Sequence, residues 1–262
     1  MNAPHDLVLL RIDDRGEAGR VAHVVANNPA KRNAVGMPGK RALAATFQQL
    51  ADDDALRAVV LTGAGDKAFI AGADIAEMKD LTPEQAEEEH TLTHVACDAV
   101  RRCPVPVIGR IDGYCLGFGM ELAAACDMRV ASDRSKFGMP EVRVGIPSGM
   151  EAVLLPSLVG WGKAAELVLT GDVIDAAEAH RCGFLQKLVT AAELDAAVGK
   201  WIESILVSGP RAVRLQKKLL RDWERLPLEG AIQAGIRACV EARRTDEPRR
   251  LMQAFLDRKK KA

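Results

Sequence analysis

The chain has 262 residues, of which 48% are apolar and 27% are charged, as in an ordinary globular protein. Lysine plus arginine equals aspartate plus glutamate at 36 each, so the zero net charge gives no general attraction to nucleic acid or to a membrane. No apolar stretch reaches the length of a membrane-spanning helix. Six scattered cysteines without a CxxC pair predict reduced thiols and a cytoplasmic protein.

Apolar runs alternate with glycine-rich turns and helical segments through the first two-thirds of the chain. The runs at 21–26, 58–61, 105–111 and 128–131 predict strands, and residues 40–50 predict a helix. A second helix is predicted to start at Thr82-Pro83-Glu84-Gln85, because threonine and glutamine at this spacing cap each other's backbone. Strands that alternate with helices favour an α/β fold.

The last third of the chain, from about residue 191, predicts amphipathic helices and no strand. Its apolar residues form three stripes at helical spacing: Ala212, Leu215, Leu219, Leu220 and Trp223; Ile232, Ile236, Cys239 and Val240; Leu251, Met252, Phe255 and Leu256. Such helices either cover the α/β core or pack against a neighbouring subunit. We therefore divide the chain into an α/β core at 1–195 and a C-terminal helical region at 196–262.

The glycine-rich segment 111–127 is the most informative part of the sequence. Gly113, Gly117 and Gly119 allow sharp turns and close backbone approach, and a helix-forming run follows at 120–126. The unpaired N–H groups of that helix start could bind an oxygen anion. Glu121 lies in the first turn, where it either stabilises the helix end or exchanges protons with a bound substrate.

Two further segments carry candidate chemistry. Residues 67–78 place small residues around Gly72, so that the N–H of Ala73 could join a second backbone donor in an oxyanion hole. Residues 137–147 place Glu141 in a turn bounded by proline and glycine and flanked by apolar residues. Such surroundings raise the pKa of a carboxyl, which suits a proton donor, although a single turn glutamate is often only structural.

These segments, in this order and spacing, resemble the signatures of the enoyl-CoA hydratase/isomerase (crotonase) family: 68–75, the glycine-rich turn leading to Glu121, and 137–141. Residues 28–34 are similar to the first loop of that family that contacts CoA. The resemblance implies an α/β spiral of ββα units that holds the CoA and acyl site, followed by C-terminal helices that form trimers, usually paired into hexamers. It implies an acyl-CoA thioester as the partner, and no metal or separate cofactor.

Carried onto this sequence, the resemblance assigns the oxyanion hole to the amides of Ala73 and Phe118, and the acid/base pair to Glu121 and Glu141. Family hydratases have both glutamates, which favours addition of water to an enoyl-CoA, with Glu141 as the acid and Glu121 holding the water. The implied substrate and CoA contacts are Ala30, Lys31, Arg32, Ala34, Ala71, Gly72, Asp74, Ile75, Gly117, Phe255 and Arg258. The last two reach the CoA of an adjoining subunit in relatives.

Two departures from the family pattern concern the acyl pocket. Phe118 stands where the family usually has glycine, so the ring must be accommodated. Residues 146–151 replace a glycine-rich stretch that helps to seat the attacking water in relatives. This variant is similar to methylthioacryloyl-CoA hydratases, which can go on to hydrolyse the thioester. Isomerisation or thioester hydrolysis on the same site is therefore the closest alternative, and a non-enzymatic RNA-binding member is a more distant one.

Three other patterns have simpler interpretations. The G-x-G-x-x-A pattern at 63–68 follows a strand but leads to no helix, which argues against a dinucleotide site. His90 and His94 have the spacing of zinc ligands but lack a third ligand at a telling distance, so they are interpreted as surface residues. Cys115 has no histidine nearby in the sequence and is interpreted as a buried small residue.

Overall fold

The computed structural model describes residues 7–259 of the chain, and their side chains as far as residue 257. A six-stranded sheet has the order β1-β2-β3-β5-β7-β10, in which β1 is antiparallel to β2 and the other neighbours are parallel. Its strands are β1 (Val8–Asp14), β2 (Arg20–Ala26), β3 (Leu56–Gly63), β5 (Val107–Ile111), β7 (Met128–Ser132) and β10 (Lys187–Val189). The strands predicted at 21–26, 58–61, 105–111 and 128–131 are confirmed, whereas β1 and β10 were missed.

A second, four-stranded sheet has the order β4-β6-β8-β9. Its strands are three residues long: β4 (Ala68–Ile70), β6 (Tyr114–Leu116), β8 (Lys136–Gly138) and β9 (Val173–Asp175). Each of β3, β5 and β7 in the large sheet is followed in the chain by a strand of the small sheet, and then by helical structure. This repetition confirms the predicted spiral of ββα units.

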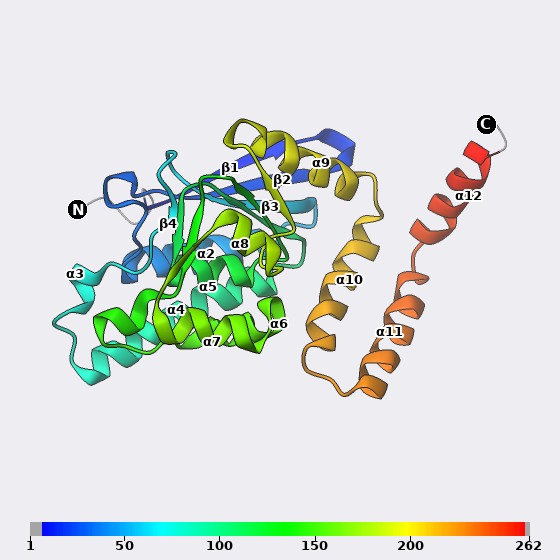
Figure 1. Cartoon of the computed structure of the whole chain (residues 1–262). Helices are drawn as coiled ribbons and strands as arrows, with labels where there is room; N and C mark the ends of the chain where they lie inside the picture. The colour runs from blue at the N-terminus through cyan, green and yellow to red at the C-terminus, as the bar shows by residue number, and fades with distance from the viewer. Residues whose placement is uncertain (1–6, 260–262) are drawn as a thin grey trace.

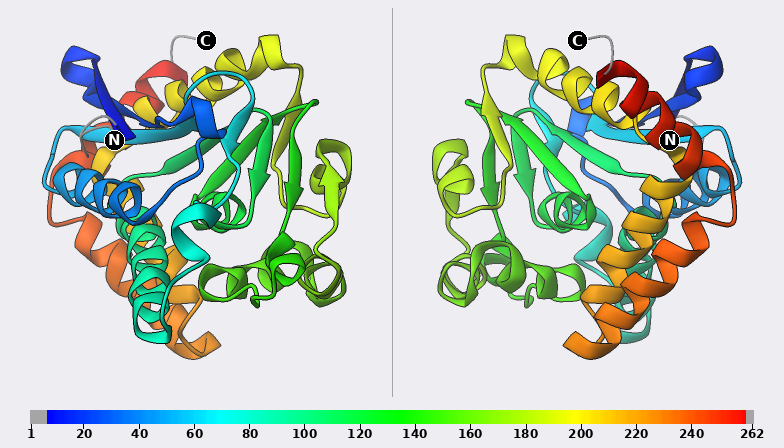
Figure 2. Two further views of the ribbon diagram at one scale, coloured as in Figure 1. Left: turned by 90° about the vertical axis from the view of Figure 1, so that its left-hand side faces the viewer. Right: turned by 90° about the vertical axis from the view of Figure 1, so that its right-hand side faces the viewer.

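Helices cover both sheets and extend beyond them (Figures 1 and 2). They are α2 (Met37–Ala51), α3 (Ile75–Met78), α4 (Pro83–Arg102), α5 (Phe118–Ala125), α6 (Leu155–Val159), α7 (Trp161–Thr170), α8 (Ala176–Arg181), α9 (Leu194–Leu206), α10 (Pro210–Trp223), α11 (Leu228–Ala242) and α12 (Glu247–Lys259). Short 3₁₀ helices are η1 (Gly16–Ala18), η2 (Pro29–Lys31), η3 (Pro140–Val144), η4 (Met150–Leu154) and η5 (Ala191–Glu193). None of the helices in the described range is both long and apolar enough to cross a membrane.

Local sequence signals explain where α4 begins and which face of α2 is buried. The predicted capping box starts α4: the Gln85 N–H donates to Thr82 Oγ1 over 3.3 Å, and the Thr82 N–H donates to Gln85 Oε1 over 2.9 Å. The apolar face of α2, with Leu43, Phe47 and Leu50, packs into the main core. These contacts hold α2 and α4 side by side, which positions one wall of the candidate site.

The C-terminal helices differ in how they meet the core. Leu194, Val198 and Ile202 of α9 pack against the outer face of the large sheet. In contrast, α11 and α12 extend away from the sheets (Figure 1). Glu247, at the start of α12, accepts hydrogen bonds from the N–H groups of Arg211 and Ala212 at the start of α10, over 3.1 and 3.0 Å. We call α11 and α12 together the C-terminal arm; the division of the chain at residue 195 stays a prediction.

Candidate active site

The glycine-rich turn places the start of α5 against the small sheet. Gly117 has φ of +52°, a conformation that favours glycine, and α5 begins at Phe118, two residues earlier than predicted. A methyl group at Gly119 would lie 2.1 Å from the carbonyl oxygen of Ile70, so no larger residue fits there without a backbone shift. The start of α5 therefore packs closely against the end of β4.

Backbone hydrogen bonds join the segment that follows β4 to the loop at 28–35. The Val35 N–H donates to the Gly72 carbonyl over 3.0 Å, and the Ala71 N–H donates to the Arg32 carbonyl over 3.1 Å. The N–H groups of Ala73 and Phe118, in contrast, find no protein acceptor within residues 7–259. Unpaired backbone donors are rare in folded proteins, and these two line the same cavity.

This cavity, which we call the acyl cavity, has a volume of about 330 Å³. It brings together eight of the predicted site residues: Ala71, Gly72, Ala73, Ile75, Gly117, Phe118, Glu121 and Glu141. Ala30, Lys31, Arg32, Ala34 and Asp74 lie on neighbouring segments but not in its wall. Phe255 lies on the C-terminal arm, away from this cavity, and the side chain of Arg258 lies outside the described residues.

The loop residues outside the cavity contact the segment that lines it. Lys31 Nζ pairs with Asp74 Oδ2 at 2.6 Å, and the Arg32 guanidinium lies 5.2 Å from the centre of the Tyr114 ring. Arg32 is exposed and has a positive φ of 52°. The predicted CoA-contacting loop is therefore fixed to the predicted oxyanion segment and presents two cations beside it.

Glu121 is the buried acid of the cavity, with 3% of its surface exposed. Its Oε1 accepts one hydrogen bond, from the Ala152 N–H over 3.1 Å. Burial raises the pKa of Glu121 to about 8, and the negative charges of Glu141 and Glu151 act in the same direction, while Ala152 and Lys40 oppose the shift. Glu121 therefore holds a proton at neutral pH.

Glu141 lies opposite, at the start of η3, and is half-buried. The Ser148 hydroxyl donates to Glu141 Oε2 over 2.7 Å, and a methyl group added at Gly117 would lie 2.5 Å from Glu141 Oε1. Ser148, within the stretch 146–151 that departs from the family pattern, thus contacts Glu141, and Ala152, directly after that stretch, contacts Glu121. The sequence predicts a raised pKa for Glu141; in the structure, burial raises the pKa of Glu121.

Several residues of the site have no clear signal in the sequence. Lys40, Glu89, His90 and Thr93 line the acyl cavity, although an isolated lysine and a glutamate-rich helix are typical of a solvated surface. His94 Nδ1 lies 2.8 Å from Glu151 Oε1, and Glu151 is 3% exposed. The interpretation of the two histidines as plain surface residues is therefore incomplete: each ring lies beside a buried glutamate.

Packing also bears on the patterns at Cys115 and at 63–68. Cys115 is fully buried, and burial raises the pKa of its thiol well above the usual value, as expected of an unreactive core residue. The glycine pattern at 63–68 leads into β4 and not into a helix. Among the described residues, no cluster of three or more His, Cys, Asp or Glu side chains is arranged to hold a metal ion.

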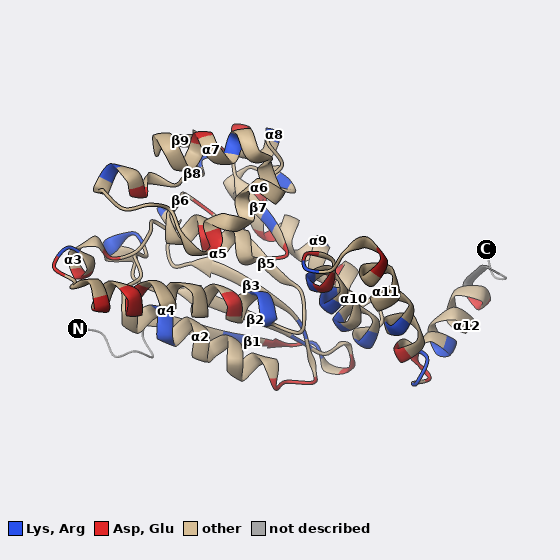
Figure 3. Ribbon diagram, turned by 90° about the horizontal axis from the view of Figure 1, so that it is seen from below, with Lys and Arg blue, Asp and Glu red and all other residues tan. Residues whose placement is uncertain are grey.

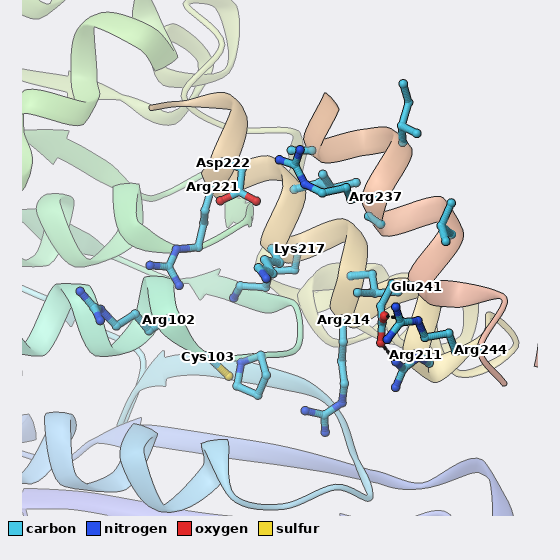
Figure 4. A pocket seen from close by; sticks show the side chains of 18 residues that line it. Arg102, Cys103, Arg211, Arg214, Lys217, Arg221, Asp222, Arg237, Glu241 and Arg244 are labelled. Carbon is cyan, nitrogen blue, oxygen red and sulfur yellow. Dashed lines mark hydrogen bonds and ion pairs between the residues drawn. The ribbon is translucent and has the colours of Figure 1, made fainter. Parts of the chain in front are cut away.

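A larger cavity of about 920 Å³ lies elsewhere, between α4, α10 and α11 (Figure 4). Basic residues of α10 and α11 gather around it, as the charge distribution in Figure 3 also shows. Several are already bound: Lys217 Nζ pairs with Asp127 at 2.8 Å and donates to the Val105 carbonyl, and Arg211 pairs with Glu241. Because neither Glu121 nor Glu141 lines it, this cavity is not the candidate active site.

The charge of Glu151 gives a testable pH effect. We expect Glu151→Gln to lower the pKa of Glu121, because the substitution removes a nearby negative charge that disfavours ionisation. If turnover needs protonated Glu121, the alkaline limb of the kcat/KM profile should move to lower pH. Glu88→Gln, an exposed change on α4, is the control. An alkaline limb that stays in place in Glu151→Gln would show that this charge does not act on the titrating group.

Comparison with known proteins agrees with this geometry. The family model for enoyl-CoA hydratase/isomerase matches residues 16–262. The chain is 36% identical to a crotonyl-CoA hydratase of Syntrophomonas wolfei over 92% of this chain and 93% of the relative, and 33% identical to a short-chain-enoyl-CoA hydratase of Clostridium acetobutylicum over the same shares. The crystal structure of an enoyl-CoA hydratase from Bacillus anthracis has a TM-score of 0.90 and 31% identity, and the match covers 95% of this chain and 96% of that one. The chain belongs to the enoyl-CoA hydratase/isomerase family.

Proposed function

We propose that this protein is an enoyl-CoA hydratase, which adds water across the 2,3 double bond of an enoyl-CoA thioester. The observation that carries the proposal is that one cavity is lined by Glu121 and Glu141 and by two residues, Ala73 and Phe118, whose backbone N–H groups have no acceptor among the described residues. Backbone donors of this kind stabilise the negative charge that develops on a thioester oxygen, and losing one typically costs about 10²–10³-fold in rate. The names of the relatives from S. wolfei and C. acetobutylicum support the same reaction.

In the proposed mechanism, the thioester oxygen accepts hydrogen bonds from the N–H groups of Ala73 and Phe118. A water molecule held between Glu121 and Glu141 attacks C3, and one carboxylate takes its proton. The electron pair of the double bond moves toward the carbonyl, and the protonated partner supplies a hydrogen to C2. Atoms and charge balance, because one carboxyl gains the proton that the other loses.

The two carboxyls share one proton in this scheme. Glu121 has a pKa of about 8 and so holds that proton before substrate binds. The assignment of Glu141 as the acid of hydration, favoured from the sequence, then requires the proton to pass through the bound water. Interacting carboxyls titrate as a pair, so we assign the two roles to the pair and not to fixed members.

Incubation with crotonyl-CoA tests the proposed function against its alternatives. Loss of the absorbance of the enoyl thioester without free thiol supports hydration. Release of thiol would identify a thioester hydrolase, and migration of the double bond in a 3-enoyl-CoA would identify an isomerase. Absence of all three, together with RNA binding, would support the non-enzymatic alternative, which the zero net charge does not favour.

We also propose a homo-oligomer, a trimer or a dimer of trimers, in which the C-terminal arm covers a subunit contact. Large apolar side chains of the arm are more than half exposed in the single chain: Leu228, Ile232, Ile236, Val240, Met252, Phe255 and Leu256. Apolar patches of this extent usually mark protein contacts. Sedimentation should therefore give a trimer or hexamer, and Ile236→Glu should shift it toward smaller species. A stable monomer of the unaltered chain would refute this assembly.

The basic residues at 258–261 are proposed to approach a CoA phosphate. Deleting 258–262 should raise KM for CoA substrates more than it lowers kcat, because charge attraction adds to affinity and weakens with salt. The oligomer should persist, since the apolar stripe of α12 ends before the cut. KM values measured at low and high salt check this, and an unchanged KM would exclude the phosphate contact. A cytoplasmic location stays a proposal that rests on the six free cysteines.

A further inference from the structure

Lys40 of α2 is a buried cation in the wall of the acyl cavity that the proposed reaction does not use. The residue is 1% exposed and lies on the core-facing side of α2, in helical register with Leu43 and Phe47. Burying an ion pair removes two charges from water, and replacing such a pair by apolar residues is often neutral or stabilising. A methionine would complete this face of α2 without that cost. The buried charge therefore calls for an explanation other than the stability of the fold.

Two side chains of α4 hold the Lys40 ammonium in one position. Lys40 Nζ pairs with Glu89 Oε1 and donates to Thr93 Oγ1 over 2.6 Å. Thr93 is itself oriented, because its hydroxyl donates to the backbone carbonyl of Glu89 over 3.2 Å. The other carboxylate oxygen of Glu89, Oε2, lies 2.8 Å from His90 Nδ1. Each group that holds the ammonium is thus held in turn, so the charge has a defined place between the two helices.

A further contact of the ammonium is the ring of Phe118, at the start of α5. Lys40 Nζ lies 5.0 Å from the centre of that ring, within the range of a cation–π interaction. Phe118 is 3% exposed, so water competes little for this contact. The backbone N–H of Phe118 is one of the two donors assigned to the oxyanion hole, and Glu121 follows three residues later in the same helix. A contact that fixes the ring therefore acts on the part of α5 that carries both groups.

On the basis of the proposed function, we propose that Lys40 is a positioning residue for hydration: its ammonium, held by Glu89 and Thr93, fixes the Phe118 ring and so directs the N–H of Phe118 at the thioester oxygen. A donor that is oriented beforehand needs no reorganisation when charge develops on that oxygen. Without the ammonium, the first turn of α5 can adopt other arrangements, of which only some present the N–H correctly. The loss should fall on kcat more than on KM, because the oxygen carries most charge in the transition state.

The double variant Lys40→Met, Glu89→Leu removes both members of the ion pair, so that neither charge is left buried alone. We expect kcat for the best enoyl-CoA to fall about 3–30-fold, the range of a cation–π contact, while KM changes much less. The values are compared on the pH plateau of each variant, because the charge of Lys40 opposes the rise that burial causes in the pKa of Glu121. The double variant Arg41→Gln, Glu88→Gln is the matched control: it removes an exposed ion pair between the same two helices and should keep full activity.

The variant Phe118→Leu tests whether Lys40 acts through the ring. It keeps the backbone N–H and an apolar side chain but removes the aromatic face. In this background, loss of the ion pair should change kcat by less than about twofold, because the contact that it would break is already absent. If loss of the ion pair lowered kcat by the same factor with either residue at this position, Lys40 would not act through the ring, and the proposal would be overturned.

Polarisation of a bound thioester tests the positioning without any turnover. Butyryl-CoA labelled with carbon-13 at the carbonyl is saturated and cannot be hydrated, and donors aimed at its oxygen move the carbonyl resonance downfield on binding. We expect this shift in the unaltered chain and in the Arg41→Gln, Glu88→Gln control, and a smaller shift in Lys40→Met, Glu89→Leu. A shift of unchanged size in that variant would overturn the role of Lys40 alone. An unaltered chain that bound butyryl-CoA without any shift would refute the oxyanion hole, and with it the proposed function.

Discussion

Glu121→Gln and Glu141→Gln are each expected to lower kcat for hydration of the best enoyl-CoA by about 10²–10⁴-fold, the usual contribution of general acid–base catalysis. Glutamine keeps the size of the side chain and a hydrogen-bond acceptor but cannot exchange a proton. In Glu121→Gln the amide oxygen can still accept from the Ala152 N–H, and in Glu141→Gln from the Ser148 hydroxyl. KM should change much less than kcat.

Steady-state kinetics of both variants and of the double variant check this expectation. Because the two carboxyls act on one water, the double variant should lose little more than either single variant. Glu203→Gln, an exposed substitution on α9, controls for the loss of a negative charge. Near-normal kcat in either single variant would contradict the two-glutamate mechanism, although it would leave the family assignment intact.

Glu121→Gln should stabilise the fold at alkaline pH while it removes activity. The pKa of Glu121 is raised from 4.5 to about 8, so between these values the folded chain binds more protons than the unfolded chain. Stability therefore falls as pH rises through this window and levels off above it. Since one pKa unit corresponds to about 1.4 kcal/mol, the variant should gain about 3–5 kcal/mol at pH above about 8 and little near pH 5.

Urea unfolding at the two pH values, with subunit concentration held constant, measures this gain. Glu203→Gln again serves as the exposed control. If Glu121→Gln were no more stable than the unaltered protein at alkaline pH, burial would not raise the pKa of the Glu121 carboxyl as described above. The proposed mechanism would then need a source other than Glu121 for the proton that reaches C2.

The central strand β3 was predictable because burial on both faces leaves a continuous apolar run at 58–61. The edge strand β1 was missed because apolar and polar residues do not alternate regularly along it. Two of its apolar side chains are largely exposed, Leu9 at 43% and Ile12 at 42%. Strands of three residues, such as β4 and β6, are too short to show a period. The sequence thus predicts the central strands of the large sheet better than its edge strands or the short strands of the second sheet.

The residues of the candidate site also fall into two groups, those that a local sequence signal predicts and those that only tertiary packing identifies. The glycines around Glu121 and the Pro-Glu turn at Glu141 are local signals, and the cavity brings their side chains together as expected. Lys40 of α2 and Glu89 of α4, in contrast, are far apart in the sequence, and only the contact between the two helices brings them together in the wall of the cavity. A lone lysine on a helix gives no sign of burial, so only tertiary packing identifies it as part of the cavity.

The capping contact of Glu247 bears on how subunits would meet. Its carboxylate, 8% exposed, bonds the backbone at the start of α10 and thereby sets the direction in which α12 leaves the molecule. Binding that must first order a loose segment loses part of its free energy to that ordering. Here the segment is oriented beforehand, so an incoming subunit would meet a surface of fixed shape, and association would lose less conformational entropy than the capture of a freely moving helix.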